Sequence, residues 1–552
     1  MDTRRLILLL ICAFTSMILV EKWNRYSHPQ PAAVSAAADA TPGAPTPTAT
    51  LKPSAPGVAA PAPVAAVPAA SSEATKIKTD LFEAVFSAQG GDLMRLELFK
   101  YTATEDKHKH LVLLDPAHSY AAQSGLIGDG LPNHKTVFQW VKGPTELAEG
   151  ADELKVRFEA QAEGAKVAKV YTFKRNSYLV DVAWEVENTG AAALAPHAYF
   201  QLQRDDVAPA GESSMVSTFT GAAVFTEAEK YQKLSFGDIV GDKAKHAKTA
   251  SDGWVAMVQH YFVSAWVPQG NVSREYYARK AGSEGSKNIV QAGLIVPMAP
   301  VAPGAKGALS VNLYSGPQTQ GVLKQVAPGL DLVVDYGMLT VVAAPIFWLL
   351  EWFHKVVGNW GWAIVGLTVL IKLIFFPLSA ASYKSMAKMR TLTPRLMSLK
   401  ERYGDDRQKL NQEMMKLYQT EKINPLGGCL PILVQIPVFI ALYWVLLGAV
   451  EMRDAPWILW IKDLSAADPF YVLPVIMVVS MVIQTKLNPT PPDPIQAKVM
   501  MIMPFAFGFM FFWFPSGLVL YWVVNNILSI AQQWQITRMI ESGGKAANDA
   551  KA

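Results

Sequence analysis

Long apolar segments fill most of the C-terminal part of the chain, and one more lies at its start. A segment of about 20 apolar residues is long enough to cross a bilayer as a helix. The pattern predicts a polytopic α-helical membrane protein with six transmembrane helices, the last five forming the core. The predicted helices cover residues 1–24, 358–378, 427–450, 470–485, 499–513 and 517–537.

A different pattern, short runs in which apolar and polar residues alternate, fills residues 76–330. Examples are 154–158, 167–173 and 178–186, and the runs are separated by Gly, Pro and Asn. Alternation with turn residues at short intervals is typical of antiparallel strands in a β-sandwich. We therefore predict a large β-sandwich domain at 76–330.

The segment 25–75 is rich in proline and alanine and predicts an extended linker, because it has too little apolar bulk to pack. Before it, Arg4 and Arg5 precede the first apolar run and no Ala-x-Ala pattern follows that run. We favour an uncleaved anchor at 1–24, with a cleaved signal peptide as the alternative.

The loop 379–426 carries ten Lys and Arg against five Asp and Glu, which places it in the cytoplasm. Two short amphipathic helices, about 384–402 and 407–420, are expected to form a hairpin around Gly404. Two interpretations of its basic side chains remain open. They act only as a topology signal, or they also dock a ribosome or a targeting factor. The candidate docking residues are Lys384, Lys388, Arg390 and Arg395.

The same rule places the other connections. The segment 451–469 is a periplasmic loop, 486–498 a cytoplasmic loop and 538–552 a cytoplasmic tail, so both termini are cytoplasmic and the sandwich is periplasmic. The segment 331–357 is apolar and aromatic but is interrupted by charged residues. We expect it to form an amphipathic helix lying at the membrane interface.

Composition narrows the function. Only 17% of the 552 residues are charged and the net charge is +4, which argues against a direct nucleic-acid partner. The two cysteines, Cys12 and Cys429, both lie in apolar segments, so neither a disulfide framework nor a cysteine metal site is expected. The sequence shows no catalytic constellation and predicts no metal and no cofactor.

Polar residues interrupt three of the predicted spans at a similar depth. Lys372 and Thr368 share a helix face, and Gln435 and Asn525 lie on the third and sixth spans. Lys372, Gln435 and Asn525 are expected about 10–12 Å from the cytoplasmic end of their helices. Such groups need partners or water inside a membrane, so they line either a wet groove open to the cytoplasm or a knot of interhelical hydrogen bonds. Lys372 alone could also extend its stem towards the interface.

Residues from about 335 to 537 strongly resemble the YidC family of membrane-protein insertases. The matching stretches include Tyr-Lys-Ser-Met-Ala-Lys-Met at 383–389, Asn-Pro-Leu-Gly-Gly-Cys at 424–429, Gln-Ile-Pro at 435–437 and Trp-Phe-Pro-Ser-Gly-Leu-Val-Leu-Tyr at 513–521. The resemblance implies an insertase and chaperone acting alone or with the Sec translocon. It also implies a mutarotase-like β-supersandwich without a known sugar activity. Family members usually carry arginine where Lys372 stands, and lysine keeps the charge but not the planar fork.

The expected function is insertion and folding of inner-membrane proteins through a hydrophilic groove open to the cytoplasm and to lipid. The client groove would contain Lys372, Gln435, Thr368 and Asn525, and the client's apolar segment would contact lipid-facing residues Phe505, Phe509 and Phe512. The expected partners are nascent inner-membrane proteins, the Sec translocon, the lipid bilayer and, at the hairpin, the ribosome and the signal recognition particle receptor. No bond is made or broken, so we predict no enzyme. The alternative is a polytopic small-molecule transporter, or a sensor, with a periplasmic binding domain.

Overall fold

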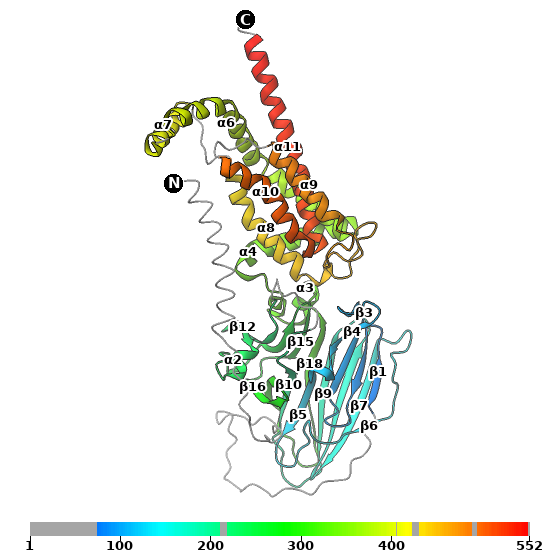
Figure 1. Cartoon of the computed structure of the whole chain (residues 1–552). Coiled ribbons are helices and arrows are strands. Elements are labelled where there is room, and N and C mark those ends of the chain that lie inside the picture. Colours follow the sequence, from blue (N-terminus) through cyan, green and yellow to red (C-terminus); the bar gives the residue numbers. More distant parts are fainter. Residues whose placement is uncertain (1–73, 210–217, 405, 422–429, 488–493, 550–552) are drawn as a thin grey trace.

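The computed structural model describes residues 74–209, 218–404, 406–421, 430–487 and 494–549 (Figure 1). The predicted anchor at 1–24 and almost all of the linker lie outside these ranges. The described chain forms a two-sheet β domain followed by a bundle of helices. The long last helix runs through the bundle and out beyond its far end (Figure 1).

The first sheet of the β domain has nine strands in the order β1-β2-β3-β5-β10-β17-β16-β13, with β4 paired to β3. These are β1 (Thr75–Lys78), β2 (Phe82–Phe86), β3 (Leu93–Thr102), β4 (His110–Leu114), β5 (Ala121–Ile127), β10 (His197–Asp205), β13 (Thr249–Ala250), β16 (Arg274–Glu284) and β17 (Lys287–Pro297).

The second sheet also has nine strands, in the order β12-β11-β14-β15-β18-β9-β8-β7-β6. These are β6 (Gln139–Val141), β7 (Glu153–Ala162), β8 (Ala165–Lys174), β9 (Leu179–Asn188), β11 (Gly221–Thr226), β12 (Lys230–Ser235), β14 (Trp254–Gln259), β15 (Phe262–Pro268) and β18 (Lys306–Pro317). The pairings within both sheets are antiparallel.

The alternating segments found in the sequence are strands of this second sheet. They fall in β7, β8 and β9, and β7 alternates between buried and exposed side chains along most of its length. The predicted β-sandwich is confirmed, because the apolar faces of both sheets meet in one buried cluster. Two short helices, α2 (Phe236–Val240) and α3 (Gln320–Val326), complete the domain.

A short, buried ion pair lies in the sandwich core. The Nζ atom of Lys169 lies 2.5 Å from Oδ1 of Asp92, and the two side chains are 0% and 2% exposed. The same Nζ donates to the carbonyl oxygens of Gly90 and Ser124, and it lies over the ring of Trp184. The pair therefore ties strand β8 to the turn before β3.

The helical part contains α4 (Thr340–Val357), α5 (Trp360–Ile374), α6 (Phe376–Tyr403), α7 (Arg407–Thr420), α8 (Leu430–Gly448), α9 (Val472–Leu487), α10 (Pro494–Met510) and α11 (Ser516–Asp549). Short 3-10 turns are η2 (Leu330–Val333) and η3 (Gly337–Leu339) before α4, η5 (Val450–Met452) after α8 and η6 (Phe511–Trp513) after α10. One apolar cluster joins these helices to one edge of the sandwich, from Phe225 and Trp254 to Leu350 and Leu367.

Three boundaries differ from those predicted. The span 358–378 breaks at Phe375, where α5 and the start of α6 meet at 61°. Pro377 lies in the first turn of α6, a position that tolerates proline because its amide needs no partner there. The first hairpin helix therefore begins at Phe376 rather than near 384, and α11 continues past 537 to Asp549.

By length and composition, α4 is the one described helix that could cross a membrane by itself, and the bent pair of α5 with residues 376–385 could form a second span. The apolar helices 435–448, 472–487 and 497–513 are shorter. Two of these shorter helices correspond to the fourth and fifth predicted spans. The count of six spans and the interfacial position of α4 remain predictions.

The sandwich and the helices meet at a polar junction between the β3–β4 loop and the segment after α8. Lys107 pairs with Asp454 at 3.0 Å and with Asp463 at 3.1 Å. Arg453 donates to the carbonyl oxygen of Thr102 at 2.7 Å. These contacts, together with the shared apolar cluster, fix the sandwich against the helices.

Replacing Asp92 by Asn should destabilise the sandwich by about 3–5 kcal/mol, because Lys169 would keep a buried charge without its counter-ion. The double variant Asp92→Leu, Lys169→Met should recover much of this loss. Urea unfolding of the purified full-length protein, followed by tryptophan fluorescence, measures both. Glu227→Gln, which removes the exposed pair with Lys230, is the control and should shift the midpoint little. Equal midpoints for Asp92→Asn and the wild type would contradict the expectation.

Candidate functional site

Helix α11 carries a buried polar face inside the apolar bundle. Asn525, Ser529 and Gln533 follow one another at four-residue spacing, so they share one side of the helix, and Asn526 lies beside them. All four are 4–7% exposed. Because polar groups in an apolar surrounding are costly unless they are paired, the neighbouring helices must supply partners.

Lys372 on α5 is the charged member of this group. Its Nζ donates to Oγ of Ser529 at 2.6 Å, and its residue is 8% exposed. Ser529 in turn donates to the carbonyl oxygen of Asn525 at 2.8 Å. Tyr383 on α6 contacts the carbonyl oxygen of Ser529 at 3.5 Å. The lysine is thus held at one turn of α11, next to the start of the basic hairpin.

The other polar side chains of α11 contact α8 and α9. Gln435 Nε2 donates to Oδ1 of Asn525 at 2.6 Å. Asn526 donates to Oγ of Ser480 at 3.1 Å. Gln533 donates to the carbonyl oxygen of Leu487 at 3.1 Å, again on α9. A single helix face therefore links α5, α6, α8 and α9.

The structure brings together three of the four residues expected in the groove. Lys372, Gln435 and Asn525 are connected through Ser529 and the α11 backbone. Thr368 is on the same face of α5 but is 1% exposed, and its hydroxyl donates to the carbonyl oxygen of Ile364 at 2.6 Å. Its hydroxyl is therefore engaged with its own helix rather than with Lys372.

Ser529, Ser480 and Gln533 were missed in the sequence. Serine is common in helices that pack closely, and its single hydroxyl gives little signal in an apolar segment. The four-residue spacing of Asn525, Ser529 and Gln533 could have identified the face. The pairing of Ser480 with Asn526 depends on how α9 crosses α11, which the sequence does not determine.

The aromatic residues expected to face lipid divide into two groups. Phe505 and Phe509 on α10 are 59% and 68% exposed. Phe512 lies in η6 instead and is half-buried against the ring of Tyr471, with centroids 5.1 Å apart. Phe505 and Phe509 thus offer an apolar surface, and Phe512 belongs to the packing between η6 and the start of α9.

The predicted helical hairpin is confirmed for the described residues. Leu392 and Leu396 of α6 are buried by partly buried apolar side chains, which come mainly from α7. Arg395 pairs with Glu421 at 2.7 Å, while Lys384 is exposed. The side chains of Lys388 and Arg390 lie outside the described part of the structure.

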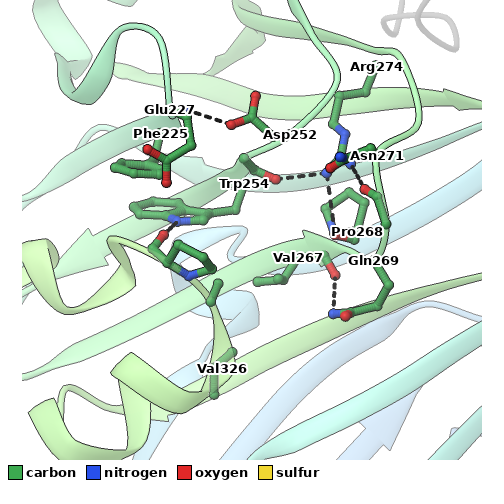
Figure 2. A pocket seen from close by; sticks show the side chains of 14 residues that line it. Phe225, Glu227, Asp252, Trp254, Val267, Pro268, Gln269, Asn271, Arg274 and Val326 are labelled. Carbon is green, nitrogen blue, oxygen red and sulfur yellow. Dashed lines mark hydrogen bonds between the residues drawn. The ribbon is translucent and has the colours of Figure 1, made fainter.

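The sandwich contains a cavity of about 320 Å³ where strands β11, β14 and β15 end near α3 (Figure 2). Arg274 extends beside it but donates to backbone carbonyls, among them those of Gly253 and Gly270. Glu227 pairs with Lys230 at 2.8 Å, and Asp252 accepts the backbone amide of Glu227. The charged groups of this cavity therefore already have structural partners. Within the described ranges, no cluster of three metal-binding side chains occurs.

An 18-stranded sandwich joined to an apolar helical bundle with a buried cationic face defines a class: membrane proteins with a large extramembrane β domain. Family models agree with this division. Residues 74–349 match the YidC periplasmic domain, and residues 352–543 match the 60Kd inner membrane protein family.

Relatives match over the whole length. The membrane protein insertase YidC of Dechloromonas aromatica is 69% identical over 554 residues, with 100% of both chains covered. The corresponding proteins of Aromatoleum aromaticum and Methylobacillus flagellatus are 60% and 54% identical, with 100% and 98% of both chains covered. The chain belongs to the YidC family of membrane protein insertases.

Two solved structures are similar in part. An active YidC insertase with its first transmembrane domain resolved is 20% identical, with a TM-score of 0.40, and the match covers 84% of this chain and 92% of that one. A galactose mutarotase related enzyme of Lactobacillus acidophilus is 10% identical, with a TM-score of 0.29 and coverage of 44% and 97%.

Replacing Ser529 by Ala should lower the stability of the helical bundle by about 1–3 kcal/mol, because Lys372 loses its hydrogen-bonding partner in a buried position. Ser529→Thr keeps the hydroxyl and should remain close to the wild type. Thermal unfolding of the full-length protein in detergent measures the difference. Ser398→Ala, on the exposed hairpin, is the matched control. Equal losses for Ala and Thr at position 529 would show that packing, not the hydrogen bond, is what matters.

Proposed function

We propose that this member of the family inserts nascent inner-membrane proteins, and helps them to fold, through the polar cluster around Lys372. The observation that carries the proposal is the charge of this cluster. Among the described residues, no carboxylate forms an ion pair with Lys372, whose hydrogen bond goes to the neutral hydroxyl of Ser529. A purely structural knot needs no uncompensated charge, whereas a site for passing acidic segments does.

The orientation proposed for the protein follows the charge of its loops. The basic hairpin α6–α7 faces the cytoplasm and the sandwich faces the periplasm, with six spans and both termini cytoplasmic. Lys372 lies three residues before the break at Phe375, from which the hairpin begins. The polar cluster is therefore near the cytoplasmic ends of its helices, where a client arrives.

Insertion then proceeds without a covalent step. The polar flank of a client enters beside Lys372, which attracts its acidic groups, while Gln435 and Asn525 offer amide hydrogen bonds. The apolar part of the client moves along the exposed rings of Phe505 and Phe509 into lipid. Its transfer is favourable by about 0.8 kcal/mol for each buried CH₂ group. We therefore propose an insertase that is not an enzyme.

The short helices lower the barrier to crossing. Helix α9 has 16 residues, which at about 1.5 Å per residue span about 24 Å. The hydrocarbon core of a bilayer is about 30 Å thick. The bilayer must therefore thin beside α9 and α10, or the short helices must be accommodated by snorkelling of flanking side chains or by oligomerisation. A client flank that crosses at this point has a shorter apolar path.

The proposed partners follow from the exposed surfaces. The hairpin, with Lys384 exposed and a basic excess, suits an anionic cytoplasmic partner such as the ribosome or the signal recognition particle receptor. The apolar face of α10 suits client helices and lipid, and the protein acts alone or together with the Sec translocon. Neither a cofactor nor direct contact with nucleic acid is part of the proposal.

Lys372→Glu should reduce insertion of a single-span client with an acidic translocated tail by at least about tenfold, because like charges repel in a low-dielectric site. Lys372→Arg should restore it. Protease protection of the client tail in cells depleted of the native insertase measures both. The same client with a neutral tail is the matched control and should respond much less. Normal insertion of the acidic-tailed client by Lys372→Glu would reject the role of the charge.

A further inference from the structure

The carboxyl group of Glu451 lies, partly buried, at the contact between the sandwich and the helices. Glu451 belongs to η5, just after α8, and its carboxylate lies close to two backbone amides, its own and that of Gln320, the first residue of α3. Its Oε2 atom is buried and has no hydrogen-bonding partner among the described residues. One acidic side chain of the helical part therefore meets the sandwich with a buried carboxylate oxygen that has no hydrogen-bonding partner.

The groups around this carboxyl do not neutralise it. Those that interact with it electrostatically are the hydroxyls of Tyr101 on β3, Tyr314 on β18 and Tyr336 before α4, and the carboxylate of Glu351 on α4, which pairs with Lys355. Arg453 is only two residues away, but its guanidinium lies over the rings of Tyr261 and Phe262 and donates to Thr102. The arginine is thus held towards the β3–β4 loop.

Burial raises the pKa of Glu451 to about 7, and the charge of Glu351 adds to the effect. The tyrosine hydroxyls near it stay uncharged near neutral pH. Burial raises the pKa of Tyr101 to about 12 and raises those of Tyr314 and Tyr336 further. Burial lowers the pKa of His260, whose Nε2 contacts the carbonyl oxygen of Leu447 across the junction, to about 4.

We propose that Glu451 makes the attachment of the sandwich proton-dependent: the neutral carboxyl allows the junction to close, and its ionisation loosens it. The physical reason is that an ionised carboxylate with an unpartnered buried oxygen is costly, whereas a neutral carboxyl is tolerated. Opening the junction lets water reach the carboxylate. The proposal concerns the contact between the two parts of the chain and does not depend on how clients pass the polar cluster.

The sign of the effect follows from proton linkage. In the open junction the carboxyl returns towards its ordinary pKa of 4.5, against about 7 in the closed one, so the closed state binds the proton more tightly. Closure of the junction is therefore most favoured below the open-state pKa of 4.5, and it weakens as the pH rises to the closed-state pKa of about 7. Across that window the ratio of open to closed molecules should rise by up to about 300-fold, and above it the ratio stays constant.

The test measures the distance between the two parts in the full-length protein in lipid nanodiscs. Cys12 and Cys429 are replaced by Ser, and spin labels are placed at the exposed positions Lys166→Cys on β8 and Val341→Cys on α4. Distances are recorded by electron spin resonance between about pH 5 and about pH 8. The wild-type junction should gain a second, broader distance population as pH rises.

Two variants decide the role of Glu451. Glu451→Gln has the same shape but no charge to gain, so it should keep the closed distance at every pH. Glu351→Gln removes the neighbouring negative charge and should move the transition to lower pH. Lys107→Ala is the control: it should loosen the junction equally at all pH values, because it breaks the pairs with Asp454 and Asp463 without touching Glu451. A wild-type distance that is independent of pH, or an unchanged pH response in Glu451→Gln, overturns the proposal.

Discussion

The helical bundle depends on the rule that polar groups in an apolar surrounding must be paired. Helix α11 places Asn525, Ser529 and Gln533 on one face. Asn525 contacts α8, Ser529 contacts α5 and Gln533 contacts the backbone of α9. These contacts fix the rotation of α11 about its axis, because a turn in either direction would leave the polar side chains against hydrocarbon. The positions of α5, α8 and α9 follow from that constraint.

The sandwich packs against the helical bundle through a continuous apolar interior. The apolar cluster that fills the bundle continues through α3 and η2 to the second sheet, so the two parts share one interior. The polar contacts of Arg453 and Lys107 then set the register at the rim of this contact. If the sandwich were joined to the helices only by a flexible chain segment, neither the shared apolar cluster nor these polar contacts would be needed. The arrangement implies that forces on the sandwich reach α8 directly, through η5.

Much of the fold could be predicted from sequence, because strands and spans are encoded by local periodicity. Strands β7, β8 and β9 and the hairpin helix α7 appear where alternation and helical spacing placed them. The break at Phe375 and the internal hydrogen bond of Thr368 were missed, since both depend on backbone geometry rather than on residue type. Lys372, Gln435 and Asn525 could be found as exceptions in apolar runs. The pairing of Ser529 with Lys372 could not be predicted, because it depends on how α5 packs against α11.

The use of lysine rather than arginine at position 372 fits the partner that the structure provides. A guanidinium presents a planar fork of donors and is best matched by two acceptor oxygens side by side. The hydroxyl of Ser529 is a single acceptor, and an ammonium group can donate one proton to it and direct the others elsewhere. A lysine held in this way keeps a point charge available to any acidic segment regardless of its orientation. Such tolerance suits the client site proposed above, for which a fixed bidentate geometry would be a disadvantage.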